Sequence, residues 1–211
     1  MKYYPAYLNL QGKKAVIVGG GNVAERKVIT LLKAGAAVTV ISPTLTNRLL
    51  KEKERGSIIH IERNYRKGDL RGSFLVIAAT DMPEVNSRIA TEATSLVNVV
   101  DVPKECTFIA PSVVQRGPLT IAISTGGASP AFAKTIRKEL EKAIGPEVGE
   151  YLKFVSSLRG KALAYISDKK ERERFLKDLA SEKTLHRLRT KGMQALKKAA
   201  EEQLEKLKTS R

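Results

Sequence analysis

The sequence predicts an α/β fold, with a Rossmann-type parallel sheet domain, a hairpin–helix segment and an α-helical C-terminal domain. Three observations support this prediction. Short β-branched runs alternate with helical patterns in the first half of the chain, which is typical of βαβ units. A glycine-rich turn follows the first of these runs. The second half is charged and helix-prone from Ala131 onward.

The first half contains the strands and helices of the predicted sheet domain. A strand is expected at 14–18, and the helix after it ends near Gly35, because glycine commonly follows the last turn of a helix. The other expected strands are 36–41, 57–61, 74–79 and 96–100, and the other expected helices are 44–55 and 83–93. The run at 74–79 is apolar throughout, as expected for a central parallel strand covered on both faces.

The pattern then changes. Strand-like runs at 112–115 and 119–124 predict a β-hairpin, which is not part of a βαβ unit. Ser129-Pro130 predicts the start of a helix, because serine is a favoured N-cap and proline is favoured in the first helical position. Helix breaks are expected at Gly145-Pro146, near Ser167 and near Ser181. The predicted domains are therefore 1–112, 113–145 and 146–211.

Composition narrows the classes of function. The apolar fraction of 42% is sufficient for a core. No apolar run approaches the roughly 18–20 residues of a membrane helix, and the start has no apolar stretch of signal-peptide length. Cys106 is the single cysteine and forms no internal disulfide, so a reducing compartment, the cytoplasm, is expected.

The net charge of +16 predicts attraction to polyanions, such as nucleic acid, an acidic membrane face or an acidic metabolite. The two histidines, His60 and His186, have no metal-ligand spacing, and the CxxC, HExxH and P-loop motifs are missing from the sequence. We therefore expect no fixed metal site. Cys106 is expected to be a buried, inert thiol.

The glycine-rich turn is the strongest local motif. Residues 19–24 read Gly-Gly-Gly-Asn-Val-Ala and fit G-x-G-x-x-G/A between a strand and a helix. Gly19 permits the tight turn, Gly21 lets the backbone approach a pyrophosphate, and Ala24 keeps the helix close to the strand. The helix N-terminus then offers free N–H groups to the phosphates. This pattern predicts dinucleotide binding; the alternative is a tight turn that binds nothing.

The second expected strand ends in Ser42-Pro43-Thr44 and not in the Asp or Glu that usually binds the ribose 2′-hydroxyl of NAD. No carboxylate there repels the 2′-phosphate of NADP, and no arginine directly there binds it. Arg48 lies one helical turn further on and either reaches the cofactor or is solvated. These residues alone leave NAD and NADP both open.

Further segments accompany the glycine turn along the first two thirds of the chain. They are Tyr4-Pro5-Ala6-Tyr7-Leu8, residues 16–27, Ala78-Ala79-Thr80-Asp81, Val97-Asn98-Val99-Val100-Asp101, Phe108-Ile109-Ala110-Pro111-Ser112 and residues 124–130. In this order and spacing they resemble the precorrin-2 dehydrogenase/sirohydrochlorin ferrochelatase family, which includes the amino-terminal part of siroheme synthase. The resemblance extends from Tyr4 to about Gly145.

The resemblance implies NAD-dependent oxidation of precorrin-2 to sirohydrochlorin, a step of siroheme and tetrapyrrole biosynthesis. Members of the family lack the acidic residue after the second strand and still use NAD, which favours NAD here. A homodimer built through the hairpin and the following helix is also implied. Some members then insert Fe²⁺ in the same cleft to make siroheme, so a bifunctional enzyme and a dehydrogenase without chelatase activity both remain open.

Asp101 is the predicted catalytic base. It follows the strand at 96–100, at the sheet edge where open α/β folds bind ligands, and it matches the essential aspartate of the family. We expect it to accept a proton from the macrocycle as the hydride leaves. The structural alternative is a loop aspartate that caps the turn before Pro103.

The remaining site residues are expected around the cofactor and the polycarboxylate tetrapyrrole. Residues expected to contact the cofactor are Gly19, Gly21, Asn22, Val23, Ala24, Ser42, Pro43, Thr44, Thr80 and Asp81. A helix cap is the alternative role for Asp81. Thr125 and Gly126 are expected near the substrate, and Arg116 and Lys104 are candidate partners of its carboxylates. The glycines at 126–127 have a structural alternative, which is to release the strand into the next helix.

Two other classes of function share some of these features. A nucleotide-sensing, nucleic-acid-binding protein would use the basic helices, but the tail interleaves acids with its bases and has no recognisable reading motif. An NAD-binding gating domain of an ion transporter would share the glycine turn. The hairpin and the Asp101 segment argue against that alternative.

Overall fold

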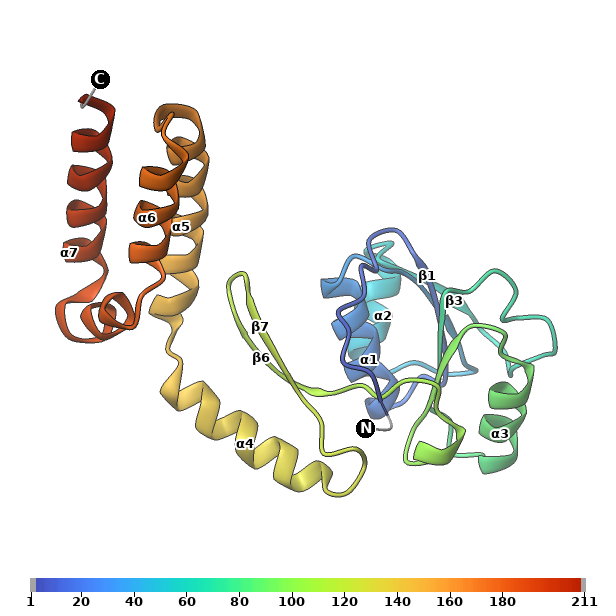
Figure 1. Cartoon of the computed structure of the whole chain (residues 1–211). Helices are drawn as coiled ribbons and strands as arrows, with labels where there is room; N and C mark the ends of the chain where they lie inside the picture. The colour runs from blue at the N-terminus through green and yellow to red at the C-terminus, as the bar shows by residue number, and fades with distance from the viewer. Residues whose placement is uncertain (1–2, 210–211) are drawn as a thin grey trace. The chain divides into compact units, whose positions relative to one another are not determined.

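The protein is described by a computed structural model that covers residues 3–209. Contacts between residues divide the chain into two units, Met1–Ala110 and Pro111–Arg211 (Figure 1). The hairpin and the helix after it, expected together in a segment at 113–145, group with the other C-terminal helices in the second unit. Within residues 3–209, no helix is both long enough and apolar enough to cross a membrane.

The first unit is built on a five-stranded parallel sheet with the order β3-β2-β1-β4-β5. Its strands are β1 (Lys14–Val18), β2 (Ala37–Ile41), β3 (Ile58–Ile61), β4 (Leu75–Ala78) and β5 (Leu96–Val99). The chain proceeds outward from β1 to β3 on one side and from β4 to β5 on the other. The strand order therefore reverses between β1 and β4, and open α/β sheets bind their ligands beyond the carboxyl ends of the strands at such a point.

Helices cover both faces of this sheet, as Figure 1 shows. Helices α1 (Asn22–Lys33) and α2 (Asn47–Glu54) pack on one face, and α3 (Pro83–Glu92) packs on the other. Successive residues of β1 alternate between the two cores, so Ile17 packs with α1 while Val16 and Val18 pack with α3. The predicted α/β, Rossmann-type architecture is confirmed.

The second unit begins with an antiparallel hairpin of β6 (Ser112–Arg116) and β7 (Leu119–Ile123). Four helices follow it in the described part of the chain: α4 (Pro130–Ala143), α5 (Pro146–Tyr165), α6 (Lys169–Leu179) and α7 (Glu182–Thr209). The Ser129 Oγ accepts a hydrogen bond from the Phe132 N–H at 3.2 Å, which confirms the predicted cap of α4. The predicted helix breaks fall between α4 and α5, α5 and α6, and α6 and α7.

Helix α7 contains a break that the sequence did not predict. Gly192 has a φ of 77°, a left-handed conformation that glycine adopts without steric penalty. The break lets residues on both sides of it reach one small core, in which Leu188 and Leu196 are buried with Tyr151 of α5. The Tyr151 hydroxyl donates to the Leu179 carbonyl oxygen at 2.8 Å and fixes α5 against the end of α6.

Two glycines of α5 allow a matched test of this packing. A Cβ on Gly149 would lie 2.6 Å from the Arg116 carbonyl carbon, whereas a Cβ on Gly160 would meet open space. Gly149→Ala should therefore lower the free energy of unfolding by roughly 1–3 kcal/mol through overpacking. Gly160→Ala should raise it by about 0.5–1 kcal/mol, because alanine loses less conformational entropy in a helix. Urea unfolding measures both, and equal effects would contradict the close approach of α5 to the hairpin.

Candidate functional site

The glycine-rich turn joins β1 to α1, and two of its glycines are required by packing. Gly19 has a φ of 119°, and a Cβ there would overlap the Ala79 carbonyl oxygen after β4. A Cβ on Gly20 would overlap the Thr44 carbonyl oxygen. The loops after β2 and β4 therefore close directly onto the turn, and a side chain at either position would push them away.

Gly21 is different, because neither its conformation nor its protein contacts require glycine. It is the N-cap of α1, with φ −82° and ψ −174°, an extended backbone that any residue adopts. Nothing lies within 4 Å of the position that its Cβ would occupy, and no side chain caps the first turn of α1. The N-terminus of α1 thus presents its N–H groups to open space, which is the arrangement that binds phosphates. Asn22 is exposed beside it and Val23 is half-buried, while Ala24 is fully buried against the sheet.

The region after β2 contains a carboxylate that comes from α1 and not from the loop itself. Ser42 is buried and packs against Gly20, whereas Pro43 and Thr44 are exposed. The Thr46 hydroxyl donates to Glu25 Oε2 at 2.6 Å and accepts from the Leu49 N–H at 3.3 Å. Glu25, in the first turn of α1, therefore faces the loop that follows β2. The usual pattern of an NAD site has its acidic residue at the end of the second strand. Glu25 lies on α1 instead, so the sequence analysis missed it.

The loop after β4 is held by a buried amide. Asn86 of α3 accepts from the Thr80 hydroxyl at 2.8 Å and from the Thr80 N–H at 3.2 Å, and it donates to the Thr80 carbonyl oxygen at 3.0 Å. These three bonds fix the backbone of Thr80, a predicted cofactor contact. Asp81 is exposed, and α3 has Met82 as its N-cap with no side-chain cap, so Asp81 does not cap that helix.

Asp101 occupies a turn immediately beyond β5. The Val102 N–H donates to the Val99 carbonyl oxygen at 3.3 Å and closes the turn. Asp101 has a φ of 61°, and no other non-glycine among residues 3–209 has a positive φ. Aspartate enters this region more readily than most residues, but the conformation still costs roughly 1–3 kcal/mol and clusters at functional sites. Its side chain is exposed at the carboxyl edge of the sheet.

Lys27 brings a half-buried cation close to this turn. It lies on α1 between the buried residues Ala24 and Val28, whose core also includes Val100 and Phe108 on either side of the Asp101 loop. Burial lowers the pKa of the Lys27 ammonium and Arg26 lowers it further, while the negative charge of Asp101 acts in the opposite direction. Sequence reasoning missed Lys27, although its helical spacing from Ala24 places it on the inward face of α1.

Three other residues predicted near the substrate, Arg116, Thr125 and Gly126, belong to the second unit, whereas Lys104 is exposed in the first unit, in the loop after β5. The Arg116 guanidinium donates to three carbonyl oxygens, those of Gln115 at 3.0 Å, Glu141 at 3.1 Å and Ile144 at 2.9 Å. It thereby caps the end of α4, and its binding of substrate carboxylates stays a prediction. Thr125 Oγ1 accepts from the Ser129 N–H at 3.1 Å, and Gly126 has a φ of 65° with open space around it. Both residues shape the entry to α4, and their substrate role stays a prediction.

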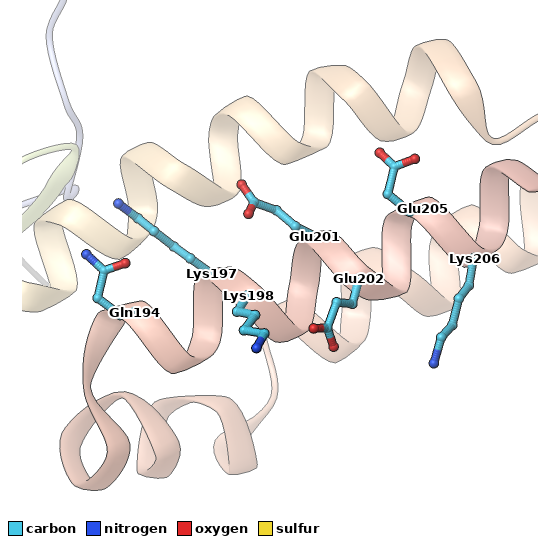
Figure 2. A pocket seen from close by; sticks show the side chains of 7 residues that line it. All are labelled: Gln194, Lys197, Lys198, Glu201, Glu202, Glu205 and Lys206. Carbon is cyan, nitrogen blue, oxygen red and sulfur yellow. The ribbon is translucent and has the colours of Figure 1, made fainter.

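Two hollows in the second unit do not have the character of an active site. One, of about 520 Å³, lies along α7, and Figure 2 shows that all the side chains lining it come from that helix. Acidic and basic groups alternate there, among them Glu201 and Lys198, so it would repel a polycarboxylate as much as attract it. Another, of about 220 Å³, lies beneath the break in α7. Within residues 3–209, no three His, Cys, Asp or Glu side chains gather as metal ligands.

Comparisons with known proteins agree with this arrangement. The NAD(P)-binding family matches residues 6–112, and the family of the central region of sirohaem biosynthesis proteins matches residues 116–143. Siroheme synthase of Methylobacillus flagellatus is 40% identical over 182 residues, which are 85% of this chain and 39% of that protein. Siroheme synthase of Thioalkalivibrio sulfidiphilus is 42% identical over 178 residues, which are 83% of this chain and 36% of that protein.

The chain therefore spans less than two fifths of the length of these two relatives. A solved structure of SirC, precorrin-2 dehydrogenase, superposes with a TM-score of 0.85 at 26% identity and covers 97% of this chain and 100% of that chain. The similarity to this structure includes both the sheet domain and the helical region that follows it.

Proposed function

Because the chain belongs to the precorrin-2 dehydrogenase family, which includes the amino-terminal region of siroheme synthase, we propose that it oxidises precorrin-2 to sirohydrochlorin with NAD⁺ as the hydride acceptor. One observation carries this proposal. The open N-terminus of α1 at Gly21, which we call the phosphate cradle, follows β1, and the left-handed Asp101 follows β5. Both therefore lie beyond carboxyl ends of strands in the same parallel sheet, at the edge where such sheets bind ligands.

The balanced reaction converts precorrin-2 and NAD⁺ into sirohydrochlorin, NADH and a proton. The nicotinamide ring supplies the hydride acceptor when the cofactor is bound. In this proposal the N–H groups at the start of α1 bind the pyrophosphate, and the absence of a side chain on Gly21 leaves room for it. Asp101 accepts the proton that the macrocycle loses, since its carboxylate is exposed in the turn directly beyond β5.

We propose NAD and not NADP because Glu25 places a carboxylate beside the loop that follows β2. The 2′-phosphate of NADP would be repelled by such a charge, whereas a ribose hydroxyl would not. Arg48 NH1 lies 3.8 Å from Glu25 Oε1 and partly offsets this charge, with 59% of the Arg48 side chain exposed. The expected preference for NAD is therefore moderate, and the ratio of kcat/KM for the two cofactors measures it.

We also propose a homodimer formed through β6, β7 and α4. Apolar side chains are exposed on these elements, with Val113 at 38% and Phe132 at 59%. A second copy of the chain would remove this apolar surface from water. Light scattering on the purified chain, with Phe132→Glu as the disrupting variant, distinguishes a dimer from a monomer.

A single assay tests the proposed reaction and its possible extension. Precorrin-2, NAD⁺ and the purified chain are mixed, NADH absorbance is followed, and Fe²⁺ is then added. Formation of NADH supports the dehydrogenase, and its absence with folded protein would reject it. Siroheme formed after the addition of Fe²⁺, faster than without protein, identifies a bifunctional enzyme. Failure of that second step alone identifies a dehydrogenase without chelatase activity.

Lys27 is the cation that we expect to bind a substrate carboxylate beside Asp101. Lys27→Met should raise the KM for precorrin-2 roughly tenfold or more, because a hydrogen bond to a charged group contributes about 1.5–3 kcal/mol. The same change should stabilise the fold at neutral pH, since the folded state alone bears the desolvation of the ammonium that lowers its pKa. This gain should disappear as pH rises past the ordinary lysine pKa of 10.5, where the side chain is neutral in both states.

The matched control is Lys33→Met, an exposed lysine in the last turn of the same helix. It should leave the KM for precorrin-2 and the melting temperature close to those of the unmodified chain. A Lys27→Met variant with an unchanged KM but a shifted pH profile of kcat would show that Lys27 acts on Asp101 and not on the substrate.

A further inference from the structure

The loop that carries Asp101 leaves β5 and then returns along the same strand. The Thr107 N–H donates to the Val97 carbonyl oxygen at 2.9 Å, and the Val97 N–H donates to Thr107 Oγ1 at 2.8 Å. One residue of the returning segment therefore satisfies both outward-facing backbone groups of one strand residue. The bond to Oγ1 depends on the threonine hydroxyl and would be lost with an apolar side chain of the same shape.

Cys106, the residue before Thr107, also bonds to backbone groups of β5 and of the turn that holds Asp101. Its sulfur accepts from the Val99 N–H at 3.2 Å, and its S–H has the carbonyl oxygens of Val99 at 3.2 Å and Val102 at 3.4 Å as acceptors. Val99 and Val102 are the first and last residues of the turn that holds Asp101. The thiol thus contacts both ends of that turn.

Asn98 completes the connection from the strand side. It is 7% exposed, and its Nδ2 donates to the Phe108 carbonyl oxygen at 3.0 Å and to the Cys106 sulfur at 3.5 Å. We define the three side chains Asn98, Cys106 and Thr107 as the clasp. Together they join both ends of the loop to the outer edge of β5.

The need to cover the unpaired backbone groups of an edge strand does not by itself explain why the clasp is present. Both β5 and β3 are edge strands of this sheet, and the segment that returns along its own strand is the one after β5. The covered edge is the one whose loop holds the single left-handed non-glycine of the described chain. A conformation that costs roughly 1–3 kcal/mol persists only where surrounding contacts over-determine it, and the clasp contributes such contacts.

We propose that Asn98, Cys106 and Thr107 are positioning residues that hold the Asp101 turn in the geometry needed for proton transfer. This inference rests on the proposed function, in which Asp101 is the base. A base must lie within hydrogen-bonding reach of the proton that it accepts, so movement of the turn lowers the rate even when the carboxylate is intact. The clasp residues themselves touch neither the substrate nor the cofactor in this proposal.

The test compares Thr107→Val, which removes the hydroxyl and keeps the shape, with Thr107→Ser, which keeps the hydroxyl. Thr107→Val should lower kcat for NADH formation by roughly 10- to 100-fold, as expected for a misplaced catalytic group. Its KM for NAD⁺ should stay unchanged, and amide hydrogen exchange at Val97 and Val102 should become faster. Thr107→Ser should restore most of the rate. Thr91→Val, which removes a hydroxyl bonded to the Ser87 carbonyl oxygen on α3, is the control and should change none of these quantities.

Several outcomes would overturn the positioning role. Faster exchange in Thr107→Val with kcat equal to that of the unmodified chain would show that the clasp only stabilises the edge. Unchanged exchange, or a Thr107→Ser variant as slow as Thr107→Val, would show that the hydroxyl is not responsible. If Thr107→Val does not fold, the pair Cys106→Ala and Cys106→Ser gives the same comparison. Absence of NADH formation by the unmodified chain would reject the proposed function itself, whereas normal activity with unaffected clasp variants rejects only the positioning role.

Discussion

Replacement of Asp101 by asparagine should lower NADH formation from precorrin-2 by roughly 10²- to 10⁴-fold, the usual contribution of a general base. Asparagine is the appropriate substitution, because Asp101 has a φ of 61° and asparagine tolerates that conformation. Alanine at this position would add backbone strain to the loss of the carboxylate, so the two effects would be confused. The rate should stay low across the pH range in which the unmodified chain is expected to form NADH.

Asp168→Asn is the matched control for this change. Asp168 caps α6 by accepting a hydrogen bond from the Glu171 N–H at 2.7 Å, and asparagine is an equally good N-cap. This variant should retain the activity and the melting temperature of the unmodified chain. Turnover near the normal rate in Asp101→Asn, with NAD⁺ bound normally, would remove Asp101 as the base.

Gly21→Asp should weaken NAD⁺ binding at least about 100-fold, because a carboxylate would occupy the phosphate cradle and repel the pyrophosphate. The same substitution should not destabilise the fold. Its side chain would enter open space, and aspartate is favoured as the N-cap of a helix. Calorimetric titration with NAD⁺ and thermal unfolding of the same preparation measure the two effects.

Gly20→Ala gives the contrasting result. A Cβ there would overlap the Thr44 carbonyl oxygen, so we expect loss of stability together with loss of cofactor binding. A Gly21→Asp variant that binds NAD⁺ as tightly as the unmodified chain would show that α1 does not hold the phosphates. A Gly21→Asp variant that fails to fold would show that the open space at this position is filled.

Much of the first unit follows from local pattern. The β-branched runs became the strands of one parallel sheet, and the glycine turn lies between β1 and α1 as its spacing predicts. The cap at Ser129 was equally predictable, because the chemistry of a helix start involves neighbouring residues only. The strand and helix bounds differ from expectation by a few residues, since the ends of elements depend on hydrogen bonds that the pattern of side chains does not specify.

The rest depends on contacts between residues distant in sequence. The clasp requires the register between β5 and the returning segment, and no local pattern encodes that register. The contacts of Arg116 with carbonyl oxygens depend on how closely the end of α4 approaches the hairpin. Glu25 reaches the loop after β2 from another helix. Among the residues that the sequence analysis missed, Lys27 was the easiest to find, because its spacing from Ala24 and Val28 marks it as an inward-facing charge.

Gly192 is the left-handed residue inside α7, and the packing of the helical unit depends on its backbone conformation. An uninterrupted α7 of 28 residues would extend about 42 Å as a straight rod. Leu188 and Leu196 would then lie about 12 Å apart along the helix axis, and the aromatic ring of Tyr151 would lose one of the two. Gly192 therefore lets both leucines reach the core around Tyr151 within their own chain, a role that neither its size nor its polarity would suggest.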